Sequence, residues 1–107
     1  RQVKAEYEAL AKANENSWRI LFSIANVFSY NEYFKEAIQM WQKTFDCMPK
    51  PRYTDSFEAM AQCCVRMGDH ESAVEYYKKE LELLREDWGL KYGAEVDALE
   101  EKIRALQ

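Results

Sequence analysis

This chain of 107 residues has few of the residues that interrupt helices or build chemical sites: 3 glycines, 2 prolines, 3 cysteines and a single histidine. The glycines are scattered singly, so there is no glycine-rich loop to cradle a phosphate. His70 has no obvious partner nearby in the sequence for acid–base or nucleophilic chemistry. We expect it to be a half-buried residue that opens a helix. The sequence therefore predicts a protein that is not an enzyme and needs no cofactor.

The three cysteines, Cys47, Cys63 and Cys64, are an odd number and lack the spacing of a disulfide framework. This pattern is typical of a reducing compartment, so we expect the cytoplasm, with the nucleus as the alternative. A zinc site built from these cysteines and His70 is a second interpretation. No C-x-x-C or H-x-x-x-H spacing supports it, and Cys64 falls on an apolar stripe. We therefore predict core packing and no metal.

Long apolar runs and clustered positive charge are also missing. No run of about 20 apolar residues is present, and no charged-then-apolar leader opens the chain, so we expect neither a membrane span nor a signal peptide. The chain does not begin with Met, and we interpret it as a fragment. With 15 basic and 19 acidic residues the net charge is −4. This balance argues against a nucleic-acid or membrane-surface partner. A hydrophobic content of 48% predicts one soluble, helix-rich domain over residues 1–107.

What the sequence does contain is an internal repeat at an offset of 36 residues. Its first half has the spacing of one helical face. Leu21, Ile24, Ala25 and Phe28 recur as Phe57, Met60, Ala61 and Cys64. The second half recurs at the same offset, with Phe34, Ala37, Ile38, Trp41, Phe45 and Met48 opposite His70, Ala73, Val74, Tyr77, Leu81 and Leu84. Each copy predicts two helices that pack as a hairpin, and the small alanines lie where the helix axes would cross.

Turn and cap residues lie between the expected helices. We expect the first hairpin turn near residues 30–33 and the second at Gly68 and Asp69. Glycine accepts positive φ at a helix end, and aspartate caps the next helix. The prolines at 49 and 51 end the helix between the copies. Thr54 or Asp55 is expected to cap the following helix, with Glu58 completing a capping box.

Both flanks of the repeat predict further helices. Residues 1–15 form an expected packing helix with Val3, Tyr7, Leu10 and Ala11 on one face. Beyond Gly89 and Gly93, residues 92–107 carry an apolar stripe made of Tyr92, Val96, Leu99, Ile103 and Leu106. This 3.5-residue spacing fits a helix that caps the stack, or a short coiled-coil seam. We favour the cap, and the alternative is a self-association module that forms a homodimer.

The repeat resembles the tetratricopeptide repeat (TPR). The residues that carry the likeness are Leu21, Ile24, Ala25, Phe28, Phe34, Ala37, Trp41 and Pro49 in the first copy, and Phe57, Met60, Ala61, Cys64, Gly68, Asp69, Ala73 and Tyr77 in the second. The departures are Glu32 in place of the turn glycine, Arg85 in place of the closing proline, and a period of 36. The resemblance implies an all-α superhelical stack of antiparallel helix hairpins with about six helices. Repeat 1 would span residues 18–49 and repeat 2 residues 53–87.

The resemblance also implies a function, because the first helix of each TPR unit lines a concave groove that binds a peptide or helix of a partner protein. The face opposite the core stripe supplies the predicted partner-binding residues, which are Arg19, Phe22, Asn26, Tyr30, Asp55, Glu58, Gln62 and Arg66. Phe22 and Tyr30 are the expected anchors, unless the N-terminal helix covers them. Only Asn26 matches the clamp that binds chaperone tails, since Phe22 and Ala59 replace a Lys and an Asn. We therefore expect an adaptor or scaffold with a different protein partner.

Overall fold

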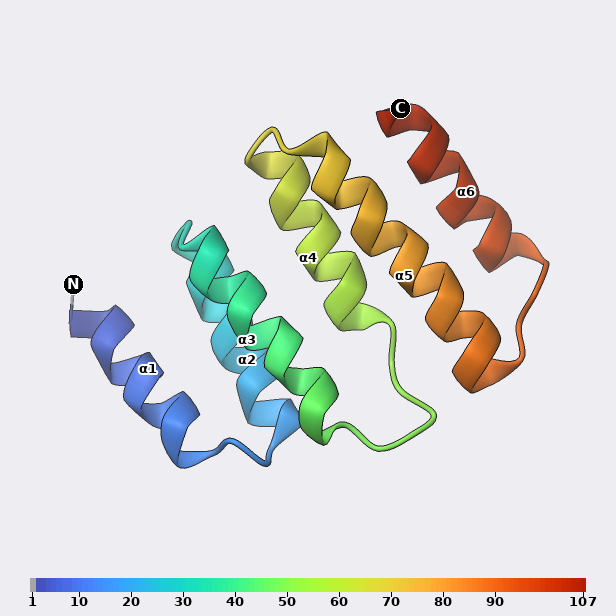
Figure 1. Ribbon diagram of the computed structural model, residues 1–107. Coiled ribbons are helices and arrows are strands. Elements are labelled where there is room, and N and C mark those ends of the chain that lie inside the picture. Colours follow the sequence, from blue (N-terminus) through green and yellow to red (C-terminus); the bar gives the residue numbers. More distant parts are fainter. Residues whose placement is uncertain (1) are drawn as a thin grey trace. The chain divides into compact units, whose positions relative to one another are not determined.

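The computed structural model describes residues 2–107, and in that part of the chain it is all-α, with six helices and no strand (Figure 1). This confirms the expected fold class and number of helices. The chain divides into two compact units, residues 1–49 and residues 50–107. Each unit is described by itself.

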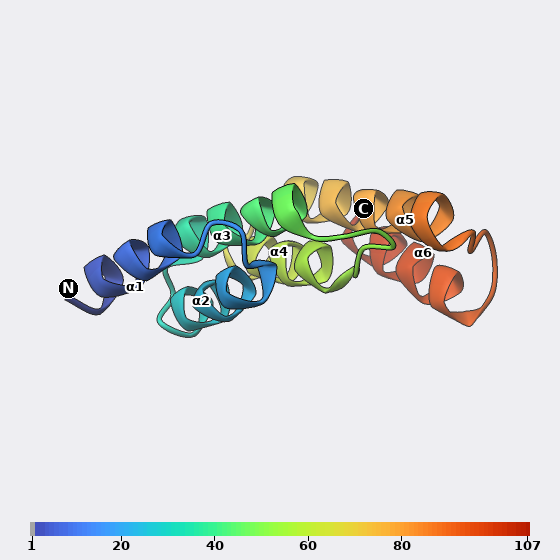
Figure 2. The same ribbon diagram turned by 90° about the horizontal axis from the view of Figure 1, so that it is seen from below.

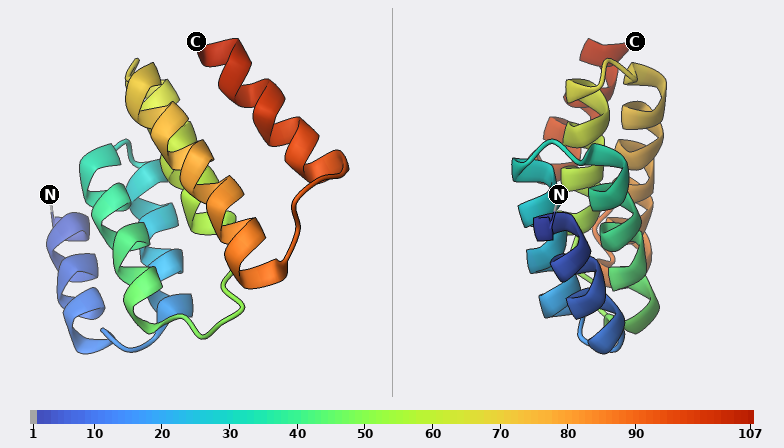
Figure 3. Two further views of the ribbon diagram at one scale, coloured as in Figure 1. Left: turned by 45° about the vertical axis from the view of Figure 1, so that its right-hand side comes forward. Right: turned by 90° about the vertical axis from the view of Figure 1, so that its left-hand side faces the viewer.

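The first unit holds α1 (Gln2–Ala13), α2 (Trp18–Tyr30) and α3 (Phe34–Cys47). The Ser17 side chain begins α2 by accepting a hydrogen bond from the Ile20 N–H at 3.3 Å. The buried residues of α2 are those of the predicted stripe, Leu21, Ile24, Ala25 and Phe28. A short connection returns the chain, so α2 and α3 pack as an antiparallel hairpin (Figure 3). The hairpin predicted for the first copy is confirmed.

The N-terminal helix α1 packs on this hairpin. The ring of Tyr7 meets Phe28 of α2 edge-on at a centroid distance of 6.5 Å, and Lys4 pairs with Glu36 of α3 at 3.0 Å. The packing face is centred on Tyr7 and Ala11, and Ala11 is 3% exposed. Leu10 lies to one side of that face and is 45% exposed, so its predicted place in the contact is wrong. The side chain of Val3 lies outside the described residues.

The second unit holds α4 (Asp55–Arg66), α5 (His70–Trp88) and α6 (Ala94–Leu106). Helices α4 and α6 both pack against α5 and lie on the same side of it (Figure 2). The buried residues of α4 include the predicted Met60, Ala61 and Cys64, together with Cys63 and Ser56. On α6, Val96, Leu99 and Ile103 are buried where the helix packs along α5. Three residues of the C-terminal stripe therefore pack on α5, whereas Tyr92, the first residue of the expected stripe, lies before α6 and is 82% exposed.

The two hairpin turns have the same backbone structure. Three backbone hydrogen bonds recur at the offset of 36. In the first turn they run from Asn31 N–H to Val27 O at 3.1 Å, from Glu32 N–H to Ser29 O at 3.0 Å and from Tyr33 N–H to Phe28 O at 2.8 Å. In the second turn they run from Met67 N–H to Cys63 O at 3.0 Å, from Gly68 N–H to Val65 O at 3.0 Å and from Asp69 N–H to Cys64 O at 2.8 Å. The last two of each set form a Schellman motif, which needs a left-handed residue. Gly68 supplies it with φ +80°, and Glu32 takes φ +66° in its place. The departure at Glu32 is therefore one of residue type and not of geometry.

The helix caps agree only in part with the sequence prediction. Asp69 caps α5 by accepting from the Ser72 N–H at 3.1 Å, as expected. The capping box at the start of α4 is wrong, because Thr54 occupies the cap position without a capping hydrogen bond from its side chain. Glu58 turns away to pair with Lys102 of α6 at 3.1 Å. His70 opens α5 but is exposed and not half-buried.

Candidate functional site

The eight predicted partner-binding residues divide equally between the two units, four on α2 and four on α4. On α2, three of the four are exposed: Arg19, Asn26 and Tyr30. Tyr30 is 88% exposed at the last residue of the helix. The Arg19 guanidinium lies 4.9 Å from the ring centroid of Trp18, a cation–π distance. These three side chains form an outward face on the first unit.

Phe22, the fourth predicted residue of α2, is not a free anchor. It is half-buried, and its ring packs edge-on against Trp41 of α3 at a centroid distance of 6.1 Å. The N-terminal helix α1 was one candidate to cover Phe22 and Tyr30. Tyr30 is exposed, and the aromatic side chain that packs on Phe22 is Trp41 of α3. Only Tyr30 therefore keeps the role of an exposed aromatic anchor.

On α4 the predicted residues also share an outward face. Asp55, Gln62 and Arg66 are exposed, and Glu58 is half-buried beside Lys102. Their spacing of three or four residues places them on neighbouring turns of one side of the helix. The lower end of this face, at Asp55, opens into a pocket.

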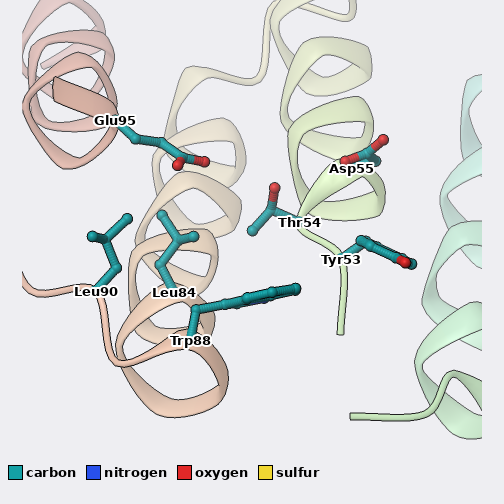
Figure 4. A pocket seen from close by; sticks show the side chains of 7 residues that line it. All are labelled: Tyr53, Thr54, Asp55, Leu84, Trp88, Leu90 and Glu95. Carbon is teal, nitrogen blue, oxygen red and sulfur yellow. The ribbon is translucent and has the colours of Figure 1, made fainter. Parts of the chain in front are cut away.

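This pocket has a volume of about 410 Å³ and lies entirely within the second unit (Figure 4). It is lined by Tyr53, Thr54, Asp55, Leu84, Trp88, Leu90 and Glu95, and we call it the α4–α6 pocket. Leu84, Trp88 and Leu90 form one apolar wall, whereas Asp55 and Glu95 stand on opposite sides, on α4 and α6 (Figure 4). The pocket thus combines an apolar surface with two carboxylates.

A set of hydrogen bonds fixes the lower wall of the pocket. The Arg52 side chain donates hydrogen bonds from Nε and Nη2 to the Asp87 carboxylate at 2.7 and 2.9 Å, and the Arg52 backbone N–H donates a third at 2.8 Å. Hydrogen bonds from Arg52 hold the pKa of the Asp87 carboxyl well below its usual range. The next residue, Trp88, donates its indole N–H to the Arg52 carbonyl at 2.6 Å. We call these contacts the Arg52 clasp, and they hold the Trp88 ring in place before any ligand arrives.

A buried carboxyl group lies behind the pocket. Glu80 of α5 is 4% exposed, and it accepts a hydrogen bond from the Thr54 hydroxyl, while its Oε1 atom has no hydrogen-bond partner. Burial raises the pKa of Glu80 to about 7, and the charges of Glu58 and Glu95 act in the same direction, whereas Lys102 opposes them. Glu80 therefore changes its ionisation near neutral pH. Such strongly perturbed groups occur more often than average at functional sites.

Sequence reasoning found Asp55 but missed most of the pocket. Leu84 is a core residue, as the repeat pattern predicts, and is 4% exposed where it lines the pocket, whereas no motif in the sequence points to Leu90 or Glu95. They come together because Gly89 takes a left-handed φ of +67° and the Leu90 N–H bonds back to the Leu84 carbonyl at 3.0 Å. The available signal in the sequence is Gly89 directly after Trp88, a large aromatic residue that is 48% exposed.

The cysteines lie in the core or at its edge. Cys63 and Cys64 are buried and Cys47 is half-buried, and none of the three is part of a disulfide in the described residues. Burial raises the pKa of Cys64 to about 11, which keeps it as a neutral thiol. Cys64 therefore packs in the core as predicted. Within residues 2–107, no group of three or more His, Cys, Asp or Glu side chains is arranged to hold a metal ion.

No protein-family model matches the chain, and no curated protein is significantly similar to it. Over the described residues, none of the helices has the length and apolar character needed to cross a membrane.

Proposed function

We propose that this chain is a TPR-like module without catalytic activity that binds a peptide or helix of a partner protein, with one outward helix face in each unit, that of α2 in the first and that of α4 in the second, available for the contact. Tyr30 is the observation that carries the proposal. Its large aromatic side chain is 88% exposed on the face opposite a fully buried stripe, and aromatic side chains are common anchors of protein interfaces. Exposed Arg19 and Asn26 supply hydrogen-bonding groups on the same face.

The turn geometry supports the resemblance to TPRs. Two hairpins that repeat their backbone hydrogen bonds at one offset are what a duplicated helix-turn-helix unit should have. The α2 face also supports a partner other than a chaperone tail, because the half-buried Phe22 occupies the position where a carboxylate clamp needs a cation. We further propose a reducing compartment, the cytoplasm or the nucleus, since the three cysteines form no disulfide in the described residues.

The test compares two exposed tyrosines, Tyr30 at 88% and Tyr92 at 82% exposure. Each is changed to Ala, and partners are captured from cell extract and quantified by mass spectrometry. We expect Tyr30→Ala to lose partners that Tyr92→Ala retains, while both variants keep the parent circular dichroism and melting temperature. Full retention by Tyr30→Ala would remove the α2 face as the binding site. Phe22→Ala is unsuitable, because it also removes the packing on Trp41.

We do not extend the proposal to self-association. Val96, Leu99 and Ile103, the centre of the stripe that a coiled coil would use, are buried inside the second unit. A dimer through this stripe would have to detach α6 from α5. We expect light scattering to give a monomer mass that does not change with protein concentration.

A further inference from the structure

The α4–α6 pocket has the form of a site for one long side chain. Its volume of about 410 Å³ is at the lower end of ligand pockets, and its wall of Leu84, Trp88 and Leu90 offers apolar contact along one side. The Arg52 clasp holds Trp88, so this wall needs no rearrangement to receive a ligand. An aliphatic chain or a flat polar group would lose water against this surface.

The charges of the pocket favour a cation. Asp55 and Glu95 are exposed carboxylates, and no Lys or Arg belongs to the lining. Two basic groups of this unit, Arg52 and Lys102, are paired with other carboxylates, Asp87 and Glu58. Asp55 and Glu95 each lie in the first turn of their helix, where the positive end of the helix dipole offsets about half of one negative charge. The C-terminal end of α5 lies at the same pocket and adds about half a negative charge. The site stays negative overall.

Glu80, a buried carboxyl group next to the pocket lining, adds to the acidic character of this region. It bonds to Thr54, which lines the pocket, and its charge interacts with that of Glu95, which also lines it. Its Oε1 atom is buried without a hydrogen-bond partner, an arrangement that costs free energy unless another group supplies a donor or a positive charge. A cation in the pocket would stabilise the ionised form of this carboxyl group.

We propose that the α4–α6 pocket receives the side chain of a lysine or arginine from the bound partner segment. The aliphatic stem lies along Leu84, Trp88 and Leu90, and the cationic head lies between Asp55 and Glu95. This specificity pocket continues the α4 face at its Asp55 end. The inference deepens the proposed function and rests on it for the source of the side chain, which is a protein partner.

The experiment titrates the whole chain with blocked single amino acids and follows amide and indole signals by NMR. The probes are N-acetyl-lysine amide, N-acetyl-arginine amide and, as the uncharged control with the same four-carbon stem as lysine, N-acetyl-norleucine amide. We expect the two basic probes to shift the signals of Thr54, Glu95 and the Trp88 indole in a saturable way, and to bind at least about fivefold more tightly than norleucine. Equal affinity for the three probes would overturn the proposal, as would shifts confined to another surface or no shift at millimolar probe.

Charge variants locate the cationic head. Glu95→Gln and Asp55→Asn should each weaken lysine binding severalfold and leave norleucine binding unchanged. Asp97→Asn is the matched control, because Asp97 is exposed in the same first turn of α6 but does not line the pocket. Equal effects of Glu95→Gln and Asp97→Asn would refute a specific contact. The probes test the pocket alone, so their failure leaves the capture result at Tyr30 intact, and loss of the Tyr30 effect leaves the probe result intact.

Discussion

Replacing the buried Glu80 with glutamine should remove most of the pH dependence of stability between about pH 5.5 and pH 8.5. Burial raises the pKa of Glu80 from an ordinary 4.5 to about 7. The folded protein therefore holds a proton that the unfolded chain releases. The stabilisation from this proton is complete below pH 4.5 and is lost as the pH rises through about 7.

The size of the effect follows from the two pKa values. The gap between 4.5 and about 7, at about 1.4 kcal/mol per pH unit, corresponds to about 3 kcal/mol at high pH. About 2 kcal/mol of this is lost between pH 5.5 and 8.5. At pH 5.5 the carboxyl group is already mostly ionised in the unfolded chain and still mostly protonated in the folded protein, so the rest of the loss falls below pH 5.5. Glutamine has nearly the same shape and no charge, so Glu80→Gln should gain about that much relative to the parent across this range.

Urea denaturation followed by circular dichroism at the two pH values measures this difference. Glu82→Gln is the matched control, because Glu82 is exposed on the same helix and should leave the parent's pH dependence unchanged. The contribution of Asp87 does not vary in this range, since its pKa is lowered and not raised. Parallel pH profiles for Glu80→Gln and the parent would refute the reasoning.

Three further predictions concern the turn, the thiols and the Arg52 clasp. Glu32→Gly should raise the free energy of unfolding by about 0.5–1 kcal/mol in urea denaturation, because glycine adopts the left-handed backbone conformation of this position without strain. A lower free energy of unfolding would contradict backbone strain at Glu32. Cys47 should react with a thiol reagent in the folded protein before the two buried cysteines, which react on unfolding, and equal rates would contradict their burial. Asp87→Asn should lower the melting temperature at neutral pH. The difference in melting temperature from the parent should shrink as the pH falls below 3.8, because Asp87 of the parent becomes protonated and loses the stabilisation from Arg52. A difference that does not change with pH would count against the ion pair.

The sequence predicted the helices well because their apolar residues follow the helical period. The stripe on α2 and the left-handed Gly68 are local features, and local features can be read from neighbouring residues. The left-handed conformation of Glu32 could not be predicted from its residue type, because glutamate rarely adopts a positive φ. Only its alignment with Gly68 at the offset of 36 indicates that conformation.

The candidate site was harder to predict, because it depends on contacts between distant residues. Glu58 looked like part of a capping box, but Lys102, on another helix, offers its carboxylate an ion pair. Phe22 looked exposed by its place on the helix, yet Trp41 is large enough to reach over and cover part of it. Helical periodicity gives the direction of a side chain and not the size of its neighbour.

The Arg52 clasp has a mechanical consequence for the second unit. Arg52 and Asp87 are 35 residues apart and join the open end of the α4–α5 hairpin, opposite the turn that closes its other end. Arg52 comes before α4, so a pull on the chain from residue 50 reaches these hydrogen bonds before it reaches the helix. The hairpin therefore resists peeling from that end until three short contacts to one carboxylate break together.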